Sequence, residues 1–599
     1  MRRTCLAIFA TGGLLVVMLS ALLRWSVIPI VDAAPLADTA LLADTIPYSP
    51  QVFTFVVTST QDSAGMCGAP SHGQYPCPSL RSAIITANGA SAGSIIQLTN
   101  NAIYNLTIDA DISDGPTTGD LNILKDMTFV ITGCTSGCRV EIRGKTGWAD
   151  RLLHVQSGAH LSLYDIVFTG GFLYYGNGGA ILIDPSGTLT MTGGQVVSNY
   201  ALDNGGGIEN DGALYLDGTL ITHNRAHSNG AGLANESTVW VTDTSIISNT
   251  ATYSGGGVYD DGTLLGQGVI ISDNVSSAGD NKGGGGLFVS ATGQVTLTGG
   301  ALRHNYTVLW GAGFHNEGRL TLNQVTLEDN SSDRAWGGGG YNGGAGTVTI
   351  NGGQVINNLA YYGGGLYQNS TGLLSLLNVS VLSNTAPLAG GVGRDGGGLY
   401  IHSGPVSITG SLFSANTASG SGGAIYQEAA SVLTLTNSTL SNNNGATTGG
   451  LYSLGSVFLN NVTIAQNPGG GVHQGGSFDL GNTLIGGNSG GDCSGSLTSH
   501  GYNLIQNTTN CTLVGDLTGV FINVNPLLGA LKDNGGSTRT HMLLPGSPAI
   551  DAGNPAASDG AGYHCQPIDQ RGHPRPIGLH CDIGAYEAGY ALYLPALMR

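Results

Sequence analysis

Charged side chains are scarce in this sequence, and basic ones are the scarcest. Only 10% of its 599 residues are charged, and 20 Lys and Arg stand against 38 Asp and Glu, giving a net charge of −18. Nucleic-acid binding needs a concentrated positive surface, so we expect no nucleic-acid partner. Hydrophobic residues make up 41% of the chain, which excludes a disordered Gly/Ser tract in spite of its 99 glycines.

Cysteine is missing from the long middle part of the chain. After residue 34, eight cysteines remain, and they fall into neighbouring pairs: Cys67 with Cys77, Cys134 with Cys138, Cys493 with Cys511, and Cys565 with Cys581. An even number of cysteines in an exported protein favours disulfides, here near the two ends. Zinc held by His564-Cys565 and His580-Cys581 is the alternative for the last pair, because both residue types are zinc ligands.

Helical periodicity is absent between about 106 and 488, and a repeat of about 25 residues takes its place. One unit, GGGIENDGALYLDGTLITHN from Gly205 to Asn224, holds a glycine clamp, a polar turn and two short strands. In every unit an aliphatic residue or Phe stands three positions before an asparagine. The asparagines are Asn199, Asn224, Asn249, Asn274, Asn305, Asn330, Asn358, Asn384, Asn416, Asn443, Asn467 and Asn488.

This repeat predicts stacked coils that bury their apolar faces against one another. Alternating pairs such as Leu214 and Leu216 point inward, and equivalent strands pair in parallel through right-handed crossovers. The asparagines are expected to form a ladder in which each side-chain amide bonds its counterpart one coil away. The predicted fold is an all-β, right-handed parallel β-helix of the pectin-lyase-like kind, capped at both ends.

Three segments resemble known families of bacterial secreted and surface proteins. Gly422–Ile425 (GGAI) and Phe413–Asn416 (FSAN) are similar to the repeat signatures of polymorphic outer-membrane proteins. Cys77–Asn88 resembles the CSLREA-type N-terminal region, with Ser82 where that family has an acidic residue or Gln; the resemblance implies a helical turn over Leu80–Asn88 that caps the first coil. The segment from Asn525, with NPLLGALKDNGG, SPAIDAGN and CDIGAYE, resembles the choice-of-anchor Q domain.

These patterns divide the chain into six segments. They are a signal peptide or N-terminal anchor at 1–34, a linker at 35–50, a CSLREA-like cap at 51–110, β-helix repeats at 111–490, a choice-of-anchor Q-like domain at 491–588 and a short tail at 589–599. The leader is predicted from Arg2 and Arg3, the apolar run from Cys5 to Leu23 and the small residues at Ala33-Ala34. We therefore expect the protein to be exported to the cell surface or the medium.

One acidic register could hold a cation. Asp211, Glu236 and Asp261 each stand three residues after the aliphatic residue of a glycine clamp, in three consecutive units. Stacking would place their carboxylates about 5 Å apart, a separation that favours bound calcium or solvent screening. The alternative is ordinary turn chemistry in Asn-Asp-Gly corners.

One aromatic register could contact sugars. Tyr367, Tyr400, Tyr426 and Tyr452 stand one residue after the same aliphatic position in four consecutive units. Stacked rings there would either form a platform for glycans or stabilise the coils by ring-on-ring packing.

Catalytic signatures are few. One adjacent acidic pair, Asp260-Asp261, lacks the basic companions that pectin-cleaving β-helices require. In the C-terminal segment Asp569, Arg571, Arg575, Asp582 and Glu587 form either a site or a buried charge network. We therefore expect a secreted or cell-surface structural and adhesion protein that contacts glycans. The alternative is a polysaccharide lyase or hydrolase of the pectate-lyase-like class, and an autotransporter passenger is a third hypothesis. Calcium is the one cofactor predicted.

Overall fold

The computed structural model describes residues 52–110, 115–277, 279, 282–333, 335–388 and 392–589. The predicted leader and linker at 1–50, and the tail beyond residue 589, lie outside the described residues. Over the described part no helix is long and apolar enough to cross a membrane.

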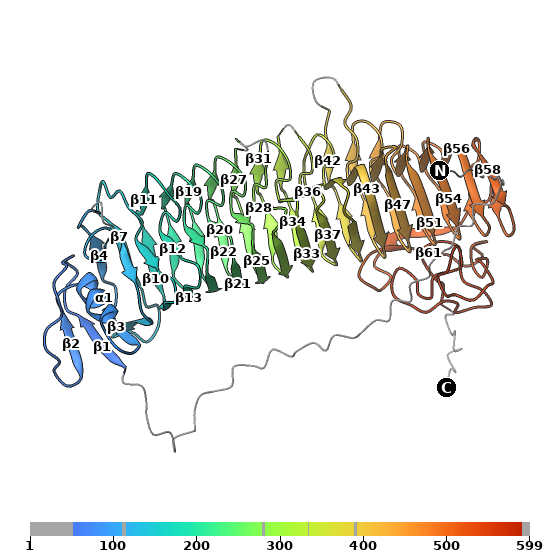
Figure 1. The fold of residues 1–599 in the computed structure, drawn as a ribbon. Coiled ribbons are helices and arrows are strands. Elements are labelled where there is room, and N and C mark those ends of the chain that lie inside the picture. The colour runs from blue at the N-terminus through green and yellow to red at the C-terminus, as the bar shows by residue number, and fades with distance from the viewer. Residues whose placement is uncertain are drawn as a thin grey trace, which may run out of the picture. The chain divides into compact units, whose positions relative to one another are not determined.

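The chain is an all-β parallel β-helix, as the repeat predicts (Figure 1). A typical coil consists of β16 (Ile208–Asn210), β17 (Ala213–Asp217), β18 (Leu220–Thr222) and β19 (Arg225–Ala226). The next coil repeats these strands as β20 (Leu233–Asn235), β21 (Thr238–Thr242), β22 (Ser245–Ile247) and β23 (Thr250–Ala251). Equivalent strands pair in parallel, so each residue lies beside its counterpart one repeat further along the chain.

A continuous apolar core fills the coils. Leu214 and Leu216 of β17 point inward and are buried, as are Val239 and Val241 of β21. The intervening residues of these strands face outward. Because burying one aliphatic side chain stabilises the fold by about 1.5–3 kcal/mol, repetition of this pattern is the main source of stability. The predicted inward register is confirmed.

The predicted asparagine ladder is present and buried along its whole length. Asn249, for example, donates through Nδ2 to Oδ1 of Asn274 at 3.1 Å, and its own Oδ1 accepts from Nδ2 of Asn224 at 3.0 Å. The same side-chain bond joins every neighbouring pair from Asn199 to Asn488. Each amide therefore satisfies the next in a place that water does not reach.

The glycine clamps allow a left-handed backbone and a close approach between neighbouring coils at one corner. Gly205, the first residue of its clamp, has φ +63°, a left-handed conformation that favours glycine. A Cβ on Gly207 would stand 2.6 Å from the carbonyl oxygen of Gly232 in the next coil. A second left-handed corner stands just before the ladder asparagines; it is held by residues other than glycine, such as Ser198 and His223, except before Asn488, where Gly487 has φ +73°.

The N-terminal end is closed by a helix. The helix α1 (Leu80–Asn88) covers the residues where the CSLREA-type resemblance implies a helical turn, and it packs beside β1 (Phe53–Val57) and β5 (Leu121–Ile123). Ser79 caps the helix by accepting from the backbone N–H of Ser82. Arg81 is buried and forms an ion pair of 2.8 Å with Asp62.

The coils run past both boundaries predicted for the repeats. Parallel pairing begins with β2 (Gln74–Cys77), β1 and β3 (Ser94–Thr99), and it ends with β58 (Asn510–Asp516) and β59 (Phe521–Ile522). We call this stack of coils, residues 53–522, the shaft.

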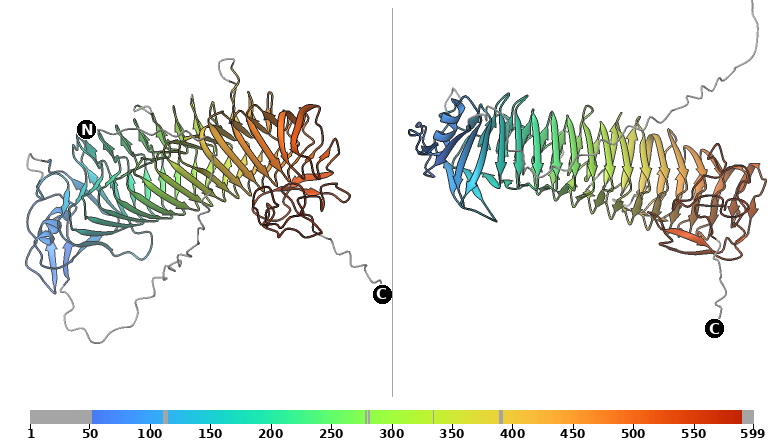
Figure 2. Two further views of the ribbon diagram at one scale, coloured as in Figure 1. Left: turned by 45° about the vertical axis from the view of Figure 1, so that its right-hand side comes forward. Right: turned by 90° about the horizontal axis from the view of Figure 1, so that it is seen from below.

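The C-terminal segment packs on the side of the shaft and not on its end (Figures 1 and 2). It contains one antiparallel pair, β60 (Leu528–Lys532) with β61 (Thr540–Leu543). Its Gln570 accepts a hydrogen bond of 2.6 Å from Thr439, and His541 bonds Ser441 at 2.8 Å. Thr439 and Ser441 belong to the shaft strand β48 (Thr439–Ser441), so this segment covers one outer face of the last coils.

All four cysteine pairs predicted from the sequence are disulfides. They are Cys67–Cys77, Cys134–Cys138, Cys493–Cys511 and Cys565–Cys581. The sulfurs of Cys565 and Cys581 are bonded to each other, which contradicts the zinc alternative because zinc requires free thiolates.

Candidate functional site

The predicted acidic residues do share one register, but only two of them come together. Asp211, Glu236 and Asp261 follow β16, β20 and β24 (Val258–Asp260) at equivalent positions. Asp261 instead accepts hydrogen bonds from the hydroxyl groups of Ser290 and Thr292. It is therefore held toward the following coil, away from the other two carboxylates.

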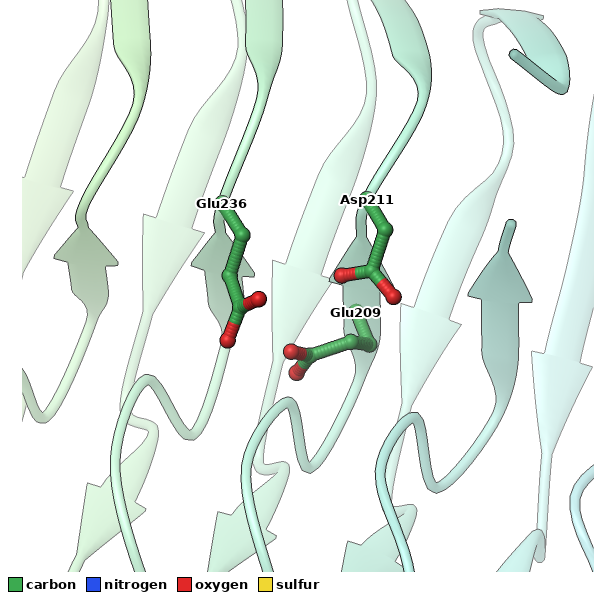
Figure 3. Close-up of side chains that lie close together, drawn as sticks. All are labelled: Glu209, Asp211 and Glu236. Atoms are coloured by element: carbon green, nitrogen blue, oxygen red, sulfur yellow. The ribbon is translucent and has the colours of Figure 1, made fainter. Parts of the chain in front are cut away.

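Glu209 takes the third place in the acidic cluster, which we define as Glu209, Asp211 and Glu236 (Figure 3). One carboxylate oxygen from each residue lies within 4.8 Å of the others. Glu209 is 0% exposed, whereas Asp211 is half-buried and Glu236 is exposed. The cluster thus reaches from the outer surface of the shaft into a site that water does not reach.

Burial and mutual repulsion both disfavour negative charge in the acidic cluster. Removal from water, followed by the charges of Asp211 and Glu236, raises the pKa of Glu209 well above its usual range. Burial, followed by the charge of Glu236, raises the pKa of Asp211 to about 6. A site of this kind holds protons or cations at neutral pH.

Sequence reasoning missed Glu209 because it compared the wrong register. Glu209 stands one residue after Ile208. This position belongs to the aromatic register and not to the acidic one. In the shaft it pairs with Leu182 of the preceding coil and Ala234 of the next. A carboxylate between two aliphatic residues was the signal that could have identified it.

The aromatic register forms one stack along the shaft. Nine consecutive coils contribute a ring: Tyr259, Phe288, His315, Tyr341, Tyr367, Tyr400, Tyr426, Tyr452 and His473. The ring centroids of Tyr367 and Tyr400 are 4.9 Å apart with an angle of 4° between planes, and those of Tyr426 and Tyr452 are 5.1 Å apart at 3°.

Most of these rings face one another, although His315 is tilted by 56° to Phe288 and by 66° to Tyr341, and a second aromatic layer covers part of them. Trp336 stacks on Tyr367 at 5.1 Å, and Tyr362 meets Tyr400 edge-on at 5.3 Å. Tyr367 and Tyr400 are only 5% and 7% exposed. Each of the four predicted glycan-contact tyrosines has a ring on both sides along the stack. A sugar at these positions would therefore meet ring edges and not ring faces.

A separate aromatic pair lies open on the shaft surface. Tyr215 of β17 and Trp240 of β21 stack at 4.5 Å with 3° between planes and are 39% and 36% exposed. They line a cavity of about 280 Å³ together with Thr190, Asp217 and Thr242. Aromatic rings, a carboxylate and hydroxyl groups in one shallow cavity are the groups that bind sugars. No aromatic repeat marks this pair in the sequence, because their counterparts in the neighbouring coils are Thr190 and Leu265.

The adjacent acidic pair Asp260-Asp261 does not form an acid–base couple. Asp260 is buried inside the coil, where Nδ2 of Asn235 donates to its Oδ1 at 2.6 Å. Asp261 is on the outside of the turn, bonded to Ser290 and Thr292. The two carboxylates therefore lie on opposite sides of the backbone and cannot act on one substrate bond.

The charged residues of the C-terminal segment are buried together. Arg575 donates to the carbonyl oxygens of Asp582 and Gly584 at 2.8 and 2.9 Å, and it lies 3.5 Å from Glu587. Arg571 forms an ion pair of 2.7 Å with Asp569. These contacts match the predicted buried network that holds a loop-rich segment together.

Comparison of the chain with protein-family models, with curated proteins and with solved structures gives no match.

Proposed function

We propose that the protein is an exported structural and adhesion protein, in which the shaft holds a glycan-contacting surface away from its point of attachment. The observation that carries the proposal is the unbroken parallel ladder from β2 to β58. At ~4.8 Å per strand step it gives a shaft about 85 Å long. The buried asparagine ladder satisfies the same amides in coil after coil, which favours a rigid rod.

Export is supported by the four disulfides, because disulfides persist in oxidising compartments outside the cytoplasm. They join residues of the first coils, of the last coils and of the C-terminal segment. The location is tested by producing the full chain in a bacterial host and labelling intact cells with a membrane-impermeant amine-reactive reagent. Labelling of the chain from outside, with oxidised cysteines, is the expected result; an unlabelled, reduced cytoplasmic protein would overturn the proposal.

Glycan contact is best supported at Tyr215 and Trp240. The cavity beside them, at about 280 Å³, is smaller than the ~300–1,000 Å³ typical of drug-sized ligands and has room for about one sugar ring. Asp217 and the threonines beside the rings offer hydrogen-bond partners for sugar hydroxyl groups. Neighbouring coils would contact neighbouring sugars of a chain.

The test is retention of the purified chain on a panel of immobilised polysaccharides. Trp240→Ala combined with Tyr215→Ala should abolish retention on the polysaccharide that binds the wild type. Phe458→Ala is the matched control, because Phe458 is 39% exposed in the same outward row but lies beside Thr434 and Asp479. Retention that survives the double substitution, or release of new reducing or unsaturated sugar ends, would contradict the proposal.

A further inference from the structure

Glu209 is a carboxylate that the fold itself does not require. It is completely buried, and neither of its carboxylate oxygens has a hydrogen-bond partner. Its counterparts in the two neighbouring coils are Leu182 and Ala234, so an aliphatic side chain suits this position. An ionised carboxylate in such a place destabilises the fold unless a cation or hydrogen bonds compensate for it.

The side chain points toward two further carboxylates, those of Asp211 and Glu236 (Figure 3). Oδ1 of Asp211 is also buried without a hydrogen-bond partner. Within the described part of the chain none of the three acidic residues is in an ion pair with Lys, Arg or His. Asp184 and Asp203 are close enough to add to the negative potential. The site therefore combines uncompensated negative charge with unused oxygen ligands.

We propose that Glu209, Asp211 and Glu236 form a calcium-binding site that links two successive coils of the shaft. Calcium binds oxygen ligands at about 2.3–2.6 Å, so oxygens on opposite sides of the ion lie about 4.6–5.2 Å apart. Ligand oxygens that all lie within 4.8 Å of one another fit around such an ion. Glu209 and Asp211 come from one coil and Glu236 from the next, so the ion connects neighbouring coils.

The ligand set favours calcium over other divalent ions. The cluster holds carboxylates alone, whereas zinc sites are built from Cys and His. Magnesium requires a near-ideal octahedron at about 2.0–2.1 Å and retains several waters, which suits a buried Glu209 poorly. The exposed Glu236 leaves one side of the site open, so that water completes the coordination of calcium.

The site differs from the one that the sequence predicts. Asp261 has the same register as Asp211 and Glu236, but its carboxylate is occupied by Ser290 and Thr292. The proposal therefore makes opposite statements about two acidic residues. Glu209 is required for calcium binding, and Asp261 is not.

Titration of calcium chloride into the full chain, after removal of metals with chelator, tests the proposal. Calorimetry should report one site per chain. Glu209→Gln, which preserves shape and removes the charge, should weaken binding at least tenfold, and Asp211→Asn should do the same. Asp261→Asn should leave the affinity within about twofold of the wild type. Calcium should also slow hydrogen exchange in peptides from residues 205–240 and not in those from residues 400–440.

A variant that simply loses its fold is identified in chelator alone. There Glu209→Gln and Glu209→Leu should both melt at or above the temperature of the wild type, because each removes an uncompensated buried charge. Failure of the wild type to bind calcium at millimolar concentration would overturn the proposal. Equal binding by wild type and Glu209→Gln, or loss of binding in Asp261→Asn, would overturn it as well.

Discussion

Asp260 is the most informative single position for testing how the interior of the shaft is held together. It ends a short buried amide row, in which Asn210 donates to Asn235 at 2.7 Å and Asn235 donates to Asp260 at 2.6 Å. The amide nitrogens of Asn210 and Asn235 also donate to backbone carbonyl oxygens. Oδ2 of Asp260 takes the place of such a nitrogen and has no hydrogen-bond partner. Asparagine therefore suits this position better than aspartate does.

The size of the effect follows from the pKa of Asp260. Burial, opposed in part by hydrogen bonding from Asn235 and from the backbone of Gln294, raises this pKa from 3.8 to about 7. The folded state therefore binds the proton more tightly than the unfolded state, and stability falls as pH rises from about 4 to about 7. A shift of roughly three units corresponds to about 4 kcal/mol. Asp260→Asn should remove this loss, leaving the variant about 4 kcal/mol more stable than the wild type at pH 8 and nearly equal to it at pH 4.

Hydrogen exchange of peptides from residues 255–270 measures the local stability around Asp260. A local measurement suits the shaft, because a stack of coils need not unfold in one step. Rates are compared between pH 5 and pH 8 after correction for intrinsic exchange. Taking the difference between variant and wild type cancels the titration of other groups. Asp243→Asn is the control, because Asp243 is exposed on the preceding coil. Faster exchange in Asp260→Asn than in the wild type at pH 8 would refute the reasoning.

Two further predictions concern the ladder and the disulfides. Asn249→Leu should destabilise its coil by about 1–3 kcal/mol, because Asn224 and Asn274 lose a buried partner. The outward-facing Thr296→Leu should cost much less, and equal melting temperatures for the two would contradict a stabilising ladder. Mild reduction should loosen the ends of the shaft while coils between about 180 and 460 keep their protease resistance, because the disulfides lie outside them. Complete proteolysis of the middle coils under reductant would show that the disulfides dominate stability.

The fold and its repeating contacts could be predicted from the sequence because, in a β-helix, residues one repeat apart in the sequence are neighbours in space. Each residue lies beside its counterpart one repeat away, so Asn224 meets Asn249 for the same reason that they are about one period apart. The inward pairs such as Leu214 and Leu216, the left-handed Gly205 and the register shared by Asp211, Glu236 and Asp261 all follow from this rule. The disulfides followed as well, because the cysteines occur in local pairs.

Other features depended on which side chains are buried, and only the tertiary structure decides that. The C-terminal segment packs against β48 through residues about 100 or more positions distant, a contact that no period encodes. The second aromatic layer, with Trp336 over Tyr367, has its own register just before the glycine clamps, and only the structure shows that it covers the tyrosines. Tyr215 and Trp240 became candidates only when their exposure was known.

The acidic cluster shows most clearly which features the sequence determines and which depend on the tertiary structure. Its period placed Asp211 beside Glu236, but the sequence by itself put Asp261 in the third place and left Glu209 in the aromatic register. Folding turns Asp261 toward the hydroxyl groups of Ser290 and Thr292 and turns Glu209 toward Asp211. The sequence determined which residues stack, because stacking depends on spacing along the chain. The tertiary structure decided which of them are buried without partners, because burial depends on every neighbour at once.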